Sequence, residues 1–316
     1  MPVVPTGPIL GEPMGPLPRP RTSAIVFAYE EEAALRQSLP SLLASSVEEI
    51  VIMYGGADGS RAYVESIRDP RVHAEFEPAR AGKWRAFNRA IEIVRGEVVY
   101  LVSGDIRFSP DVLAHLYSQF TSEVGVVFPR VVPTNIGNTV TQLGATLWDV
   151  HDAQIRECQR RGMPIHGGEL QAVRREVLEA LDGVVNEDAY LCLRANKRGY
   201  RVVYDREAVV YNTVPETMGE FLAQRARVNY GHRQLADVGQ DPSTLDRLVW
   251  TRPEICVRVL AKCVRERPVN GLRLPALALV ELMALSQGKR DFLRHIDYSR
   301  WTLIRSGKGG AAHADD

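Results

Sequence analysis

Short apolar runs alternate with amphipathic segments along the first third of the chain. The apolar runs predict buried strands, at residues 24–28, 50–54 and 98–102. The amphipathic segments between them predict helices, at residues 31–44, 61–67 and 81–94. Strands that alternate with helices form parallel βαβ units, and ligands in such sheets bind at the carboxyl ends of the strands. We therefore expect an α/β fold with a binding site at that edge of the sheet.

The two ends of the chain differ from its centre in amino-acid composition and in predicted secondary structure. Prolines and glycines alternate through the N-terminus, which therefore cannot sustain helix or ladder hydrogen bonds. Near the C-terminus, further helices are predicted at residues 255–264 and 274–285. Together these features predict four parts: an extended Pro/Gly-rich arm at 1–21, an α/β domain at 22–240, a helical C-terminal extension at 241–306 and a disordered tail at 307–316.

The C-terminal helices leave two interpretations open. The apolar run at 274–285 contains about a dozen residues, whereas a membrane span needs about 20. It is expected either to pack on the main domain or on a second subunit, as in a homodimer, or to make peripheral contact with a membrane beside basic residues. The basic residues are Arg258, Lys262, Arg265 and Arg267.

The overall composition excludes some classes of partner. Of 316 residues, 45% are hydrophobic and 25% are charged, which is typical of soluble globular proteins. Lys plus Arg and Asp plus Glu are equal at 39 each, and no basic block is present, so nucleic acid is not an expected partner. The four cysteines lack C-x-x-C spacing and are expected to be buried thiols in a reducing compartment. Because the N-terminus also lacks the apolar core of a signal peptide, we expect a cytoplasmic protein, or one bound peripherally at the inner face of the membrane.

The first candidate site segment, Ser103-Gly104-Asp105, directly follows a predicted strand. A carboxylate at the end of a strand can hold a hard divalent cation, Mg²⁺ or Mn²⁺, while the phosphates of a nucleotide supply further oxygen ligands. Such an ion neutralises charge on a departing diphosphate. The alternative interpretation is an ordinary loop aspartate in a turn with Gly104.

Two further segments carry charges of opposite sign. Asn186-Glu187-Asp188 precedes a predicted helix at 189–197, so its carboxylates either include a general base for an acceptor hydroxyl or cap the helix. Gln224 and Arg227 lie three positions apart on a predicted helix at 218–234 and therefore share a face. The guanidinium can grip diphosphate oxygens, or it can belong to a solvated basic surface.

The order of these segments resembles the glycosyltransferase family 2 pattern of inverting, nucleotide-sugar-dependent enzymes with the GT-A fold. The resemblance covers about residues 22–232. Its motifs are, in chain order, Ala28-Tyr29-Glu30-Glu31-Glu32, Gly82-Lys83-Trp84-Arg85-Ala86-Phe87-Asn88, Ser103-Gly104-Asp105, Gly167-Gly168-Glu169-Leu170, Asn186-Glu187-Asp188, and Gln224 with Arg227. The resemblance implies a Rossmann-like, mainly parallel sheet flanked by helices, to which the C-terminal helices are added.

The resemblance also implies a role for each matched residue. Asp105 would bind Mg²⁺ or Mn²⁺, Asp188 would be the general base, and Arg227 with Lys83 would stabilise the departing diphosphate. The nucleotide-sugar site would include Ala28, Tyr29, Glu31, Asp58, Lys83, Asn88, Ser103, Gly104, Gln224 and Arg227. The acceptor side would include Gly168, Glu169 and Glu187. The donor would be a nucleotide-diphosphate sugar, and the acceptor a small molecule, a lipid-linked molecule or a glycan.

Departures from the family pattern narrow the prediction. Ser103 replaces the first aspartate of D-x-D, and Asp58 is the nearest acid to the usual base-reading pair, so the nucleotide base is open. UDP is the commonest donor nucleotide of the family. Val228 replaces the tryptophan on which acceptor sugars stack in polysaccharide synthases. We therefore predict metal-dependent transfer of one sugar with inversion, without processive polymerisation.

Two other classes of function stay open at this point. A nucleotidyltransferase also needs a metal-bound aspartate, but it should have a glycine-rich, basic loop after the first strand, where this chain has the acidic run Tyr29-Glu30-Glu31-Glu32. A catalytically inactive nucleotide-sugar-binding protein would be consistent with the changes at Ser103 and Val228.

The middle of the chain carries weaker signals. Residues 133–168 are interpreted as loops that determine specificity. His151 and His166 lie within this region, and His232 lies on the helix of the basic segment. The histidines are expected to be solvated or satisfied locally, with contact to the acceptor or to a metal ion as the alternative. The tryptophans expected to act as packing groups are Trp84 and Trp148.

Overall fold

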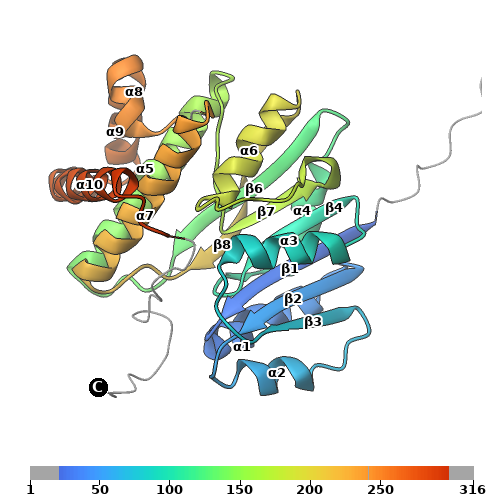
Figure 1. Ribbon diagram of the computed structural model, residues 1–316. Helices are drawn as coiled ribbons and strands as arrows, with labels where there is room; N and C mark the ends of the chain where they lie inside the picture. The colour runs from blue at the N-terminus through green and yellow to red at the C-terminus, as the bar shows by residue number, and fades with distance from the viewer. Residues whose placement is uncertain (1–20, 241, 299–316) are drawn as a thin grey trace, which may run out of the picture.

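The computed structural model describes residues 21–240 and 242–298. The predicted tail and all of the predicted arm except Arg21 lie outside these residues, and the division into four parts stays a prediction. The described chain is built on a twisted sheet with helices on both of its faces, and further helices gather at one side (Figure 1).

The sheet contains eight strands in the order β3-β2-β1-β4-β7-β6-β8-β5. The strands are β1 (Thr22–Tyr29), β2 (Glu49–Gly55), β3 (Val72–Glu77), β4 (Val98–Ser103), β5 (Arg107–Phe108), β6 (Val124–Pro133), β7 (Leu170–Arg174) and β8 (Arg201–Asn212). Pairing is parallel from β3 through β2 and β1 to β4, and again between β6 and β8. β7 and β5 run antiparallel to their neighbours, so the sheet is mixed and its first half matches the predicted βαβ units.

Helices cover the sheet on both faces. α1 (Glu32–Leu43), α2 (Ser60–Ser66) and α4 (Asp111–Ser118) contribute buried side chains to the core on one face. On the other face, α3 (Lys83–Ile93) and α6 (Glu187–Lys197) contribute to a second core. A short 3-10 helix, η1 (Arg175–Val177), follows β7. Because both faces are covered, the inner strands are apolar at nearly every position, which is the pattern seen in the sequence.

A long helix, α5 (Thr139–Arg160), occupies the region that was predicted to be loops. It begins with a capping box in which Thr141 N donates to Asn138 Oδ1 at 2.9 Å and Asn138 N donates to Thr141 Oγ1 at 3.0 Å. The interpretation of residues 133–168 as loops was therefore wrong. The buried face of α5 includes Gly144, Thr146, Asp152 and Gln154, which weaken the apolar period by which a helix is recognised.

The C-terminal helices pack on the rest of the described chain. α7 (Met218–Asp237) is followed by α8 (Leu245–Thr251), α9 (Pro253–Glu266) and α10 (Asn270–Leu293), and α10 lies against α7 (Figure 1). Arg225 Nε on α7 lies 2.6 Å from Glu281 Oε1 on α10. The two helices approach so closely that a Cβ at Gly288 would lie 2.6 Å from the carbonyl oxygen of Ala226. Packing on the main domain, one of the expected alternatives, is thus observed.

The length of the helices and the state of the cysteines also bear on what the sequence predicts. α10 spans 24 residues, about twice the predicted segment. None of the helices in the described ranges is both long and apolar enough to cross a membrane. All four cysteines are buried and free, as expected from their spacing.

Candidate active site

A cavity of about 1150 Å³ lies at the carboxyl ends of β1 and β4, where the α/β pattern predicts a ligand site. All but two of the predicted site residues line it. Those that do are Ala28, Tyr29, Glu31, Lys83, Ser103, Gly104, Asp105, Gly168, Glu169, Glu187, Asp188, Gln224 and Arg227. Residues from β1, β4, α6 and α7 therefore meet in one place, although they are separated by up to two hundred positions in the sequence.

Asp105 is presented by a turn that is fixed to the first strand. Gly104 N donates to Phe27 O at 3.0 Å, and Ser38 Oγ donates to Gly104 O at 2.9 Å. A Cβ at position 104 would lie 2.8 Å from Phe27 O, so only glycine allows this approach. The turn thereby holds the Asp105 backbone at the edge of the cavity.

The donor atoms around Asp105 fit a divalent cation that is shared with a ligand. Within residues 21–240 and 242–298, no group of three or more His, Cys, Asp or Glu side chains is arranged to hold a metal ion. The Asp105 carboxylate is a hard oxygen donor of the kind that Mg²⁺ and Mn²⁺ prefer, and phosphate oxygens and water can complete their coordination. The residues present are compatible with such an ion when diphosphate is bound beside Asp105.

Asp188 lies against the main chain of the segment before β7. A Cβ at Gly168 would be only 2.2 Å from Asp188 Oδ2, so a side chain at position 168 would displace the carboxyl group. Gln171 Nε2 donates to Gly167 O at 2.6 Å and to Asp188 O at 3.0 Å. One β7 side chain thus links the glycine segment to the start of α6 and fixes both around Asp188.

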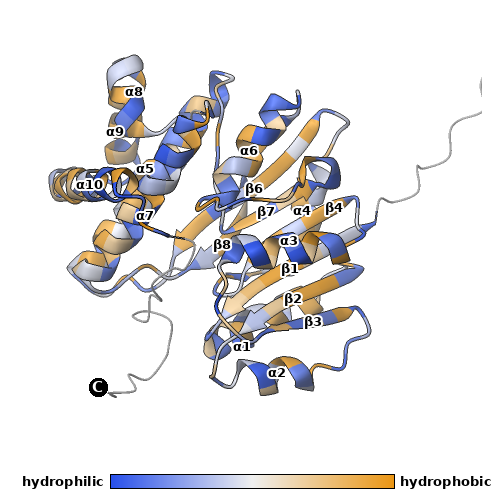
Figure 2. Cartoon of the chain, viewed as in Figure 1, coloured by the Kyte–Doolittle hydropathy of each residue, from blue (hydrophilic) through white to orange (hydrophobic). Residues whose placement is uncertain are grey.

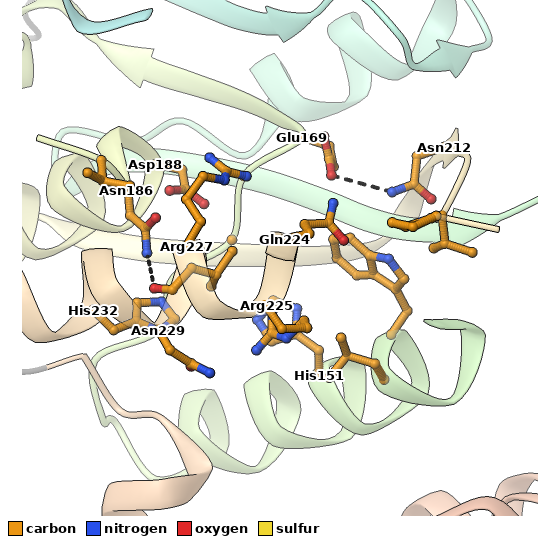
Figure 3. Close-up of a pocket in the computed structure, with 18 of the residues that line it drawn as sticks. His151, Glu169, Asn186, Asp188, Asn212, Gln224, Arg225, Arg227, Asn229 and His232 are labelled. Carbon is orange, nitrogen blue, oxygen red and sulfur yellow. Dashed lines mark hydrogen bonds between the residues drawn. The ribbon is translucent and has the colours of Figure 1, made fainter. Parts of the chain in front are cut away.

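A second set of hydrogen bonds ties the start of α6 to α7. Asn186 Nδ2 donates to Val228 O at 2.9 Å (Figure 3). Gln234 Oε1 accepts from Val185 N at 3.1 Å, and its Nε2 donates to Gly183 O at 2.8 Å. Because the segment that precedes Asp188 is attached to the helix that carries Arg227, the two side chains face the same cavity, side by side in Figure 3.

The charged groups in the cavity influence one another strongly. Lys83 forms an ion pair with Glu187. Burial raises the pKa of the Asp188 carboxyl and the Glu187 carboxylate raises it further, while Lys83 and Arg227 act in the opposite direction. Burial lowers the pKa of Arg227, although the nearby carboxylates of Glu187, Asp188 and Glu169 oppose that change. The site therefore holds a carboxylate of increased basicity beside two cations.

Two predicted residues lie elsewhere. Asn88 is not among the lining residues: its side chain donates to Leu181 O and accepts from Leu181 N, both at 2.8 Å. Asp58 accepts from Glu32 N at 2.9 Å and from Ser60 N at 3.1 Å, so it supports the starts of α1 and α2. In both residues main-chain N–H groups bond to the side-chain oxygens, and their assignment to the nucleotide site stays a prediction.

The cavity also contains residues that sequence reasoning missed or ranked low. Arg80 lies with its guanidinium carbon 5.1 Å from the ring centre of Tyr29, and burial lowers its pKa. Its position shortly before Gly82-Lys83 was the available signal. Asn212 Nδ2, at the end of β8, lies 3.4 Å from Glu169 Oε1 (Figure 3). No motif drew attention to Asn212.

Three histidines form a row on the cavity wall. His151 lies on α5, whereas the sequence was interpreted as placing it in a loop. Its ring centre lies 6.0 Å from that of His166, which in turn lies 5.0 Å from that of His232. Burial lowers the pKa of His151 to about 3 and that of His166 to about 4, and it lowers the pKa of His232 well below the ordinary value. The rings are therefore neutral at pH 7.

The mixed sheet with this cavity at its strand ends has the architecture of the GT-A glycosyltransferases. The structure resembles the mannosyltransferase PcManGT from Pyrobaculum calidifontis, solved in complex with GDP-Man and Mn²⁺. The TM-score is 0.59 at 21% sequence identity, and the match covers 89% of each chain. The predicted fold class is thus confirmed.

Comparison of the sequence identifies the family. Residues 18–231 match the glycosyltransferase-like family 2, and the chain belongs to this family. An N-acetylglucosaminyltransferase from Rhizobium meliloti (strain 1021) is 27% identical over 243 residues, which cover 69% of this chain and 57% of that protein. A poly-beta-1,6-N-acetyl-D-glucosamine synthase from Staphylococcus aureus (strain COL) is 22% identical over 230 residues, or 67% of this chain and 54% of that protein. The chain spans little more than half the length of these curated relatives.

Proposed function

We propose that the protein transfers one sugar from a nucleotide-diphosphate sugar to an acceptor hydroxyl, with inversion at the anomeric carbon. The observation that carries this proposal is the convergence of Asp105, Asp188 and Arg227 on one cavity. A carboxylate for a cation, a carboxylate base and a guanidinium for diphosphate are the three groups that such a transfer requires.

The diphosphate is bound by the cationic part of the site. Arg227 donates to its oxygens, and Lys83 reaches the same region from the start of α3. Asp105 would hold Mg²⁺ or Mn²⁺ beside the diphosphate, and the ion would neutralise the charge that develops as the diphosphate departs. Ser103 and Gly104 line the same part of the cavity as Asp105 and contact the nucleotide portion of the donor.

Asp188 accepts the proton of the acceptor hydroxyl. The hydroxyl oxygen attacks the anomeric carbon, the bond from that carbon to the diphosphate oxygen breaks, and the proton passes to the Asp188 carboxylate. A single displacement of this kind inverts the configuration. The raised pKa of Asp188 supports the role, because a more basic carboxylate accepts the proton more readily.

The donor is proposed to be a UDP-sugar, and other nucleotides are tested beside it. Stabilisation of the protein by UDP-, GDP- and other nucleotide sugars, each with and without Mn²⁺, identifies the donor by mass action. Release of a nucleoside diphosphate during turnover is expected; release of pyrophosphate would instead indicate a nucleotidyltransferase. Absence of turnover with a donor that binds would indicate a protein that only binds nucleotide sugars.

Replacement of Asp188 by asparagine tests the assigned base. The variant Asp188→Asn is expected to abolish turnover while the affinity for the donor stays near that of the unmodified protein. Asp182→Asn is the matched control, because Asp182 is exposed and does not line the cavity. Retained turnover in the Asp188 variant would refute the assignment.

A further inference from the structure

The cavity that contains Asp188 continues along an apolar wall. Helices α5, α8, α9 and α10 supply this wall on the side away from the sheet, where Figure 2 shows many hydrophobic positions. Its apolar members are Leu147, Trp148, Leu245, Val249, Trp250, Leu260, Leu274, Pro275, Leu277, Ala278, Leu282 and Leu285. A nucleotide sugar is polar, so it would make few favourable apolar contacts with so many hydrocarbon side chains.

The apolar wall opens to the outside of the molecule. Trp250 is 86% exposed, Leu282 is 64% exposed and Leu260 is 40% exposed, and all three line the cavity. Exposed apolar side chains that border a binding cavity mark an interaction site. The wall therefore connects the reacting groups to an apolar opening between the C-terminal helices.

The segment that forms α8, α9 and α10 carries an excess of positive charge, although its charged residues that line the cavity are Asp246 and Glu281. Between Leu245 and Tyr298 the sequence contains ten Lys or Arg residues and six Asp or Glu residues. Three of the acidic residues form ion pairs with the rest of the chain: Glu254 with Arg161, Glu266 with Arg156, and Glu281 with Arg225. Two of the arginines do so as well: Arg258 with Glu157, and Arg267 with Asp149. An apolar patch on helices of net positive charge is suited to an amphiphile that comes from an anionic lipid surface.

We infer that the acceptor is an amphiphile whose hydroxyl-bearing head lies at Asp188 and whose hydrocarbon chain lies along the wall of α5, α8, α9 and α10. The inference rests on the proposed function, which requires the acceptor hydroxyl to reach Asp188 within this cavity. Because the donor takes the polar part beside Asp105 and Arg227, the acceptor occupies the part that is lined by hydrocarbon.

The length of the hydrocarbon chain tests this inference. Methyl β-D-glucoside and n-octyl β-D-glucoside share one head and differ in their chains, so the ratio of their affinities isolates the contribution of the chain. Each buried methylene group contributes about fourfold in affinity, so burial of three gives about 50-fold tighter binding of the octyl compound. Binding is measured from the fluorescence of the cavity tryptophans, below the concentration at which micelles form.

Two variants of α10 provide a matched pair. Leu282 is 64% exposed and lines the cavity, whereas Leu279 is 61% exposed and does not line it. Leu282→Gln is expected to weaken octyl glucoside binding about fivefold without changing the affinity for methyl glucoside. Leu279→Gln is expected to leave both affinities within about twofold. Similar exposure of the two leucines makes a general effect on solubility or folding equal in both variants.

Several outcomes would overturn the inference. Equal affinity for the two glucosides, or an equal loss in both variants, would show that the wall does not hold the chain. An equal loss accompanied by dissociation of a dimer in sedimentation would assign the apolar face to contact between two copies. Stabilisation by donor nucleotides is measured in the same preparations: if it persists while chain length has no effect, only this inference fails. If no donor binds, the proposed function fails together with it.

Discussion

Gly168 provides a direct test of how accurately Asp188 must be placed. In Gly168→Ala the new methyl carbon would lie 2.2 Å from Asp188 Oδ2, 2.3 Å from its Cβ and 2.5 Å from its Cγ. The main chain around position 168 has little freedom to move away, because Gly167 O accepts from Gln171 Nε2 at 2.6 Å and Glu169 O accepts from Ser103 N at 3.1 Å. Asp188 therefore has to yield, and because its Cβ is fixed by the main chain, the start of α6 has to shift with it.

The size of the effect follows from these distances. To restore an ordinary van der Waals contact, the carboxyl group has to retreat by about 1 Å. A displacement of about 1 Å in a reacting group costs about 100-fold in rate, or about 2.7 kcal/mol in activation free energy. Overpacking of this kind also lowers the free energy of unfolding by about 1–3 kcal/mol. The three atoms nearest to the new methyl group all belong to Asp188, so the substitution acts first on the base and not on the donor site.

The assay compares kcat with donor affinity. Gly168→Ala is expected to lower kcat about 100-fold with the donor Kd unchanged, as measured by nucleotide release and by thermal shift. Gly137→Ala is the control, because a Cβ at position 137 meets no other atom within 4 Å. A folded Gly168→Ala protein with unchanged kcat would refute the argument that the position of Asp188 controls the reaction.

Three further predictions concern the charges, the helix packing and the role of Asn88. Glu187→Gln removes a charge that raises the pKa of Asp188, so the acidic limb of the pH profile of kcat should move to lower pH; an unchanged limb would contradict this coupling. Gly288→Ala places a methyl group 2.6 Å from a carbonyl oxygen of α7 and should lower the free energy of unfolding by about 1–3 kcal/mol in urea titrations, whereas Gly271→Ala, whose nearest contact would be 3.6 Å, should be neutral or stabilising. Asn88→Ala removes two hydrogen bonds to the main chain and should lower Tm with the donor Kd within about twofold; a large loss of donor affinity would support the original nucleotide-binding prediction.

Much of the first half of the fold could be predicted because each signal was local. The strands β1, β2 and β4 are buried on both faces and appear in the sequence as apolar runs. β3 was missed because it is the edge strand, and its residues His73 and Ala74 are exposed. An edge strand that faces solvent needs no apolar run, so its sequence resembles that of a loop.

The position of a site residue could be predicted where its side-chain type has one usual role. It could not be predicted where the same side chain can serve several roles. Asp105 and Arg227 follow recognisable segments and line the cavity as expected. Asn88 also lies in a matched motif, yet its amide bonds to the main chain of Leu181, ninety-three positions away. A contact of that range depends on the packing of two elements, which the spacing of residues within one motif does not encode.

Val228 lines the cavity, and its side chain bears on why the protein would add a single sugar. Its carbonyl oxygen accepts from Asn186, so the main chain at this position holds the base segment whatever the side chain is. The valine side chain lacks the ring on which a sugar stacks, and it lines the same cavity as Leu277 on α10. If the grip on the acceptor comes from its hydrocarbon chain and not from its sugars, each new sugar would gain no binding energy of its own. A growing glycan would then have nothing to hold it in register for a second transfer, which is the physical basis for non-processive transfer in this chain.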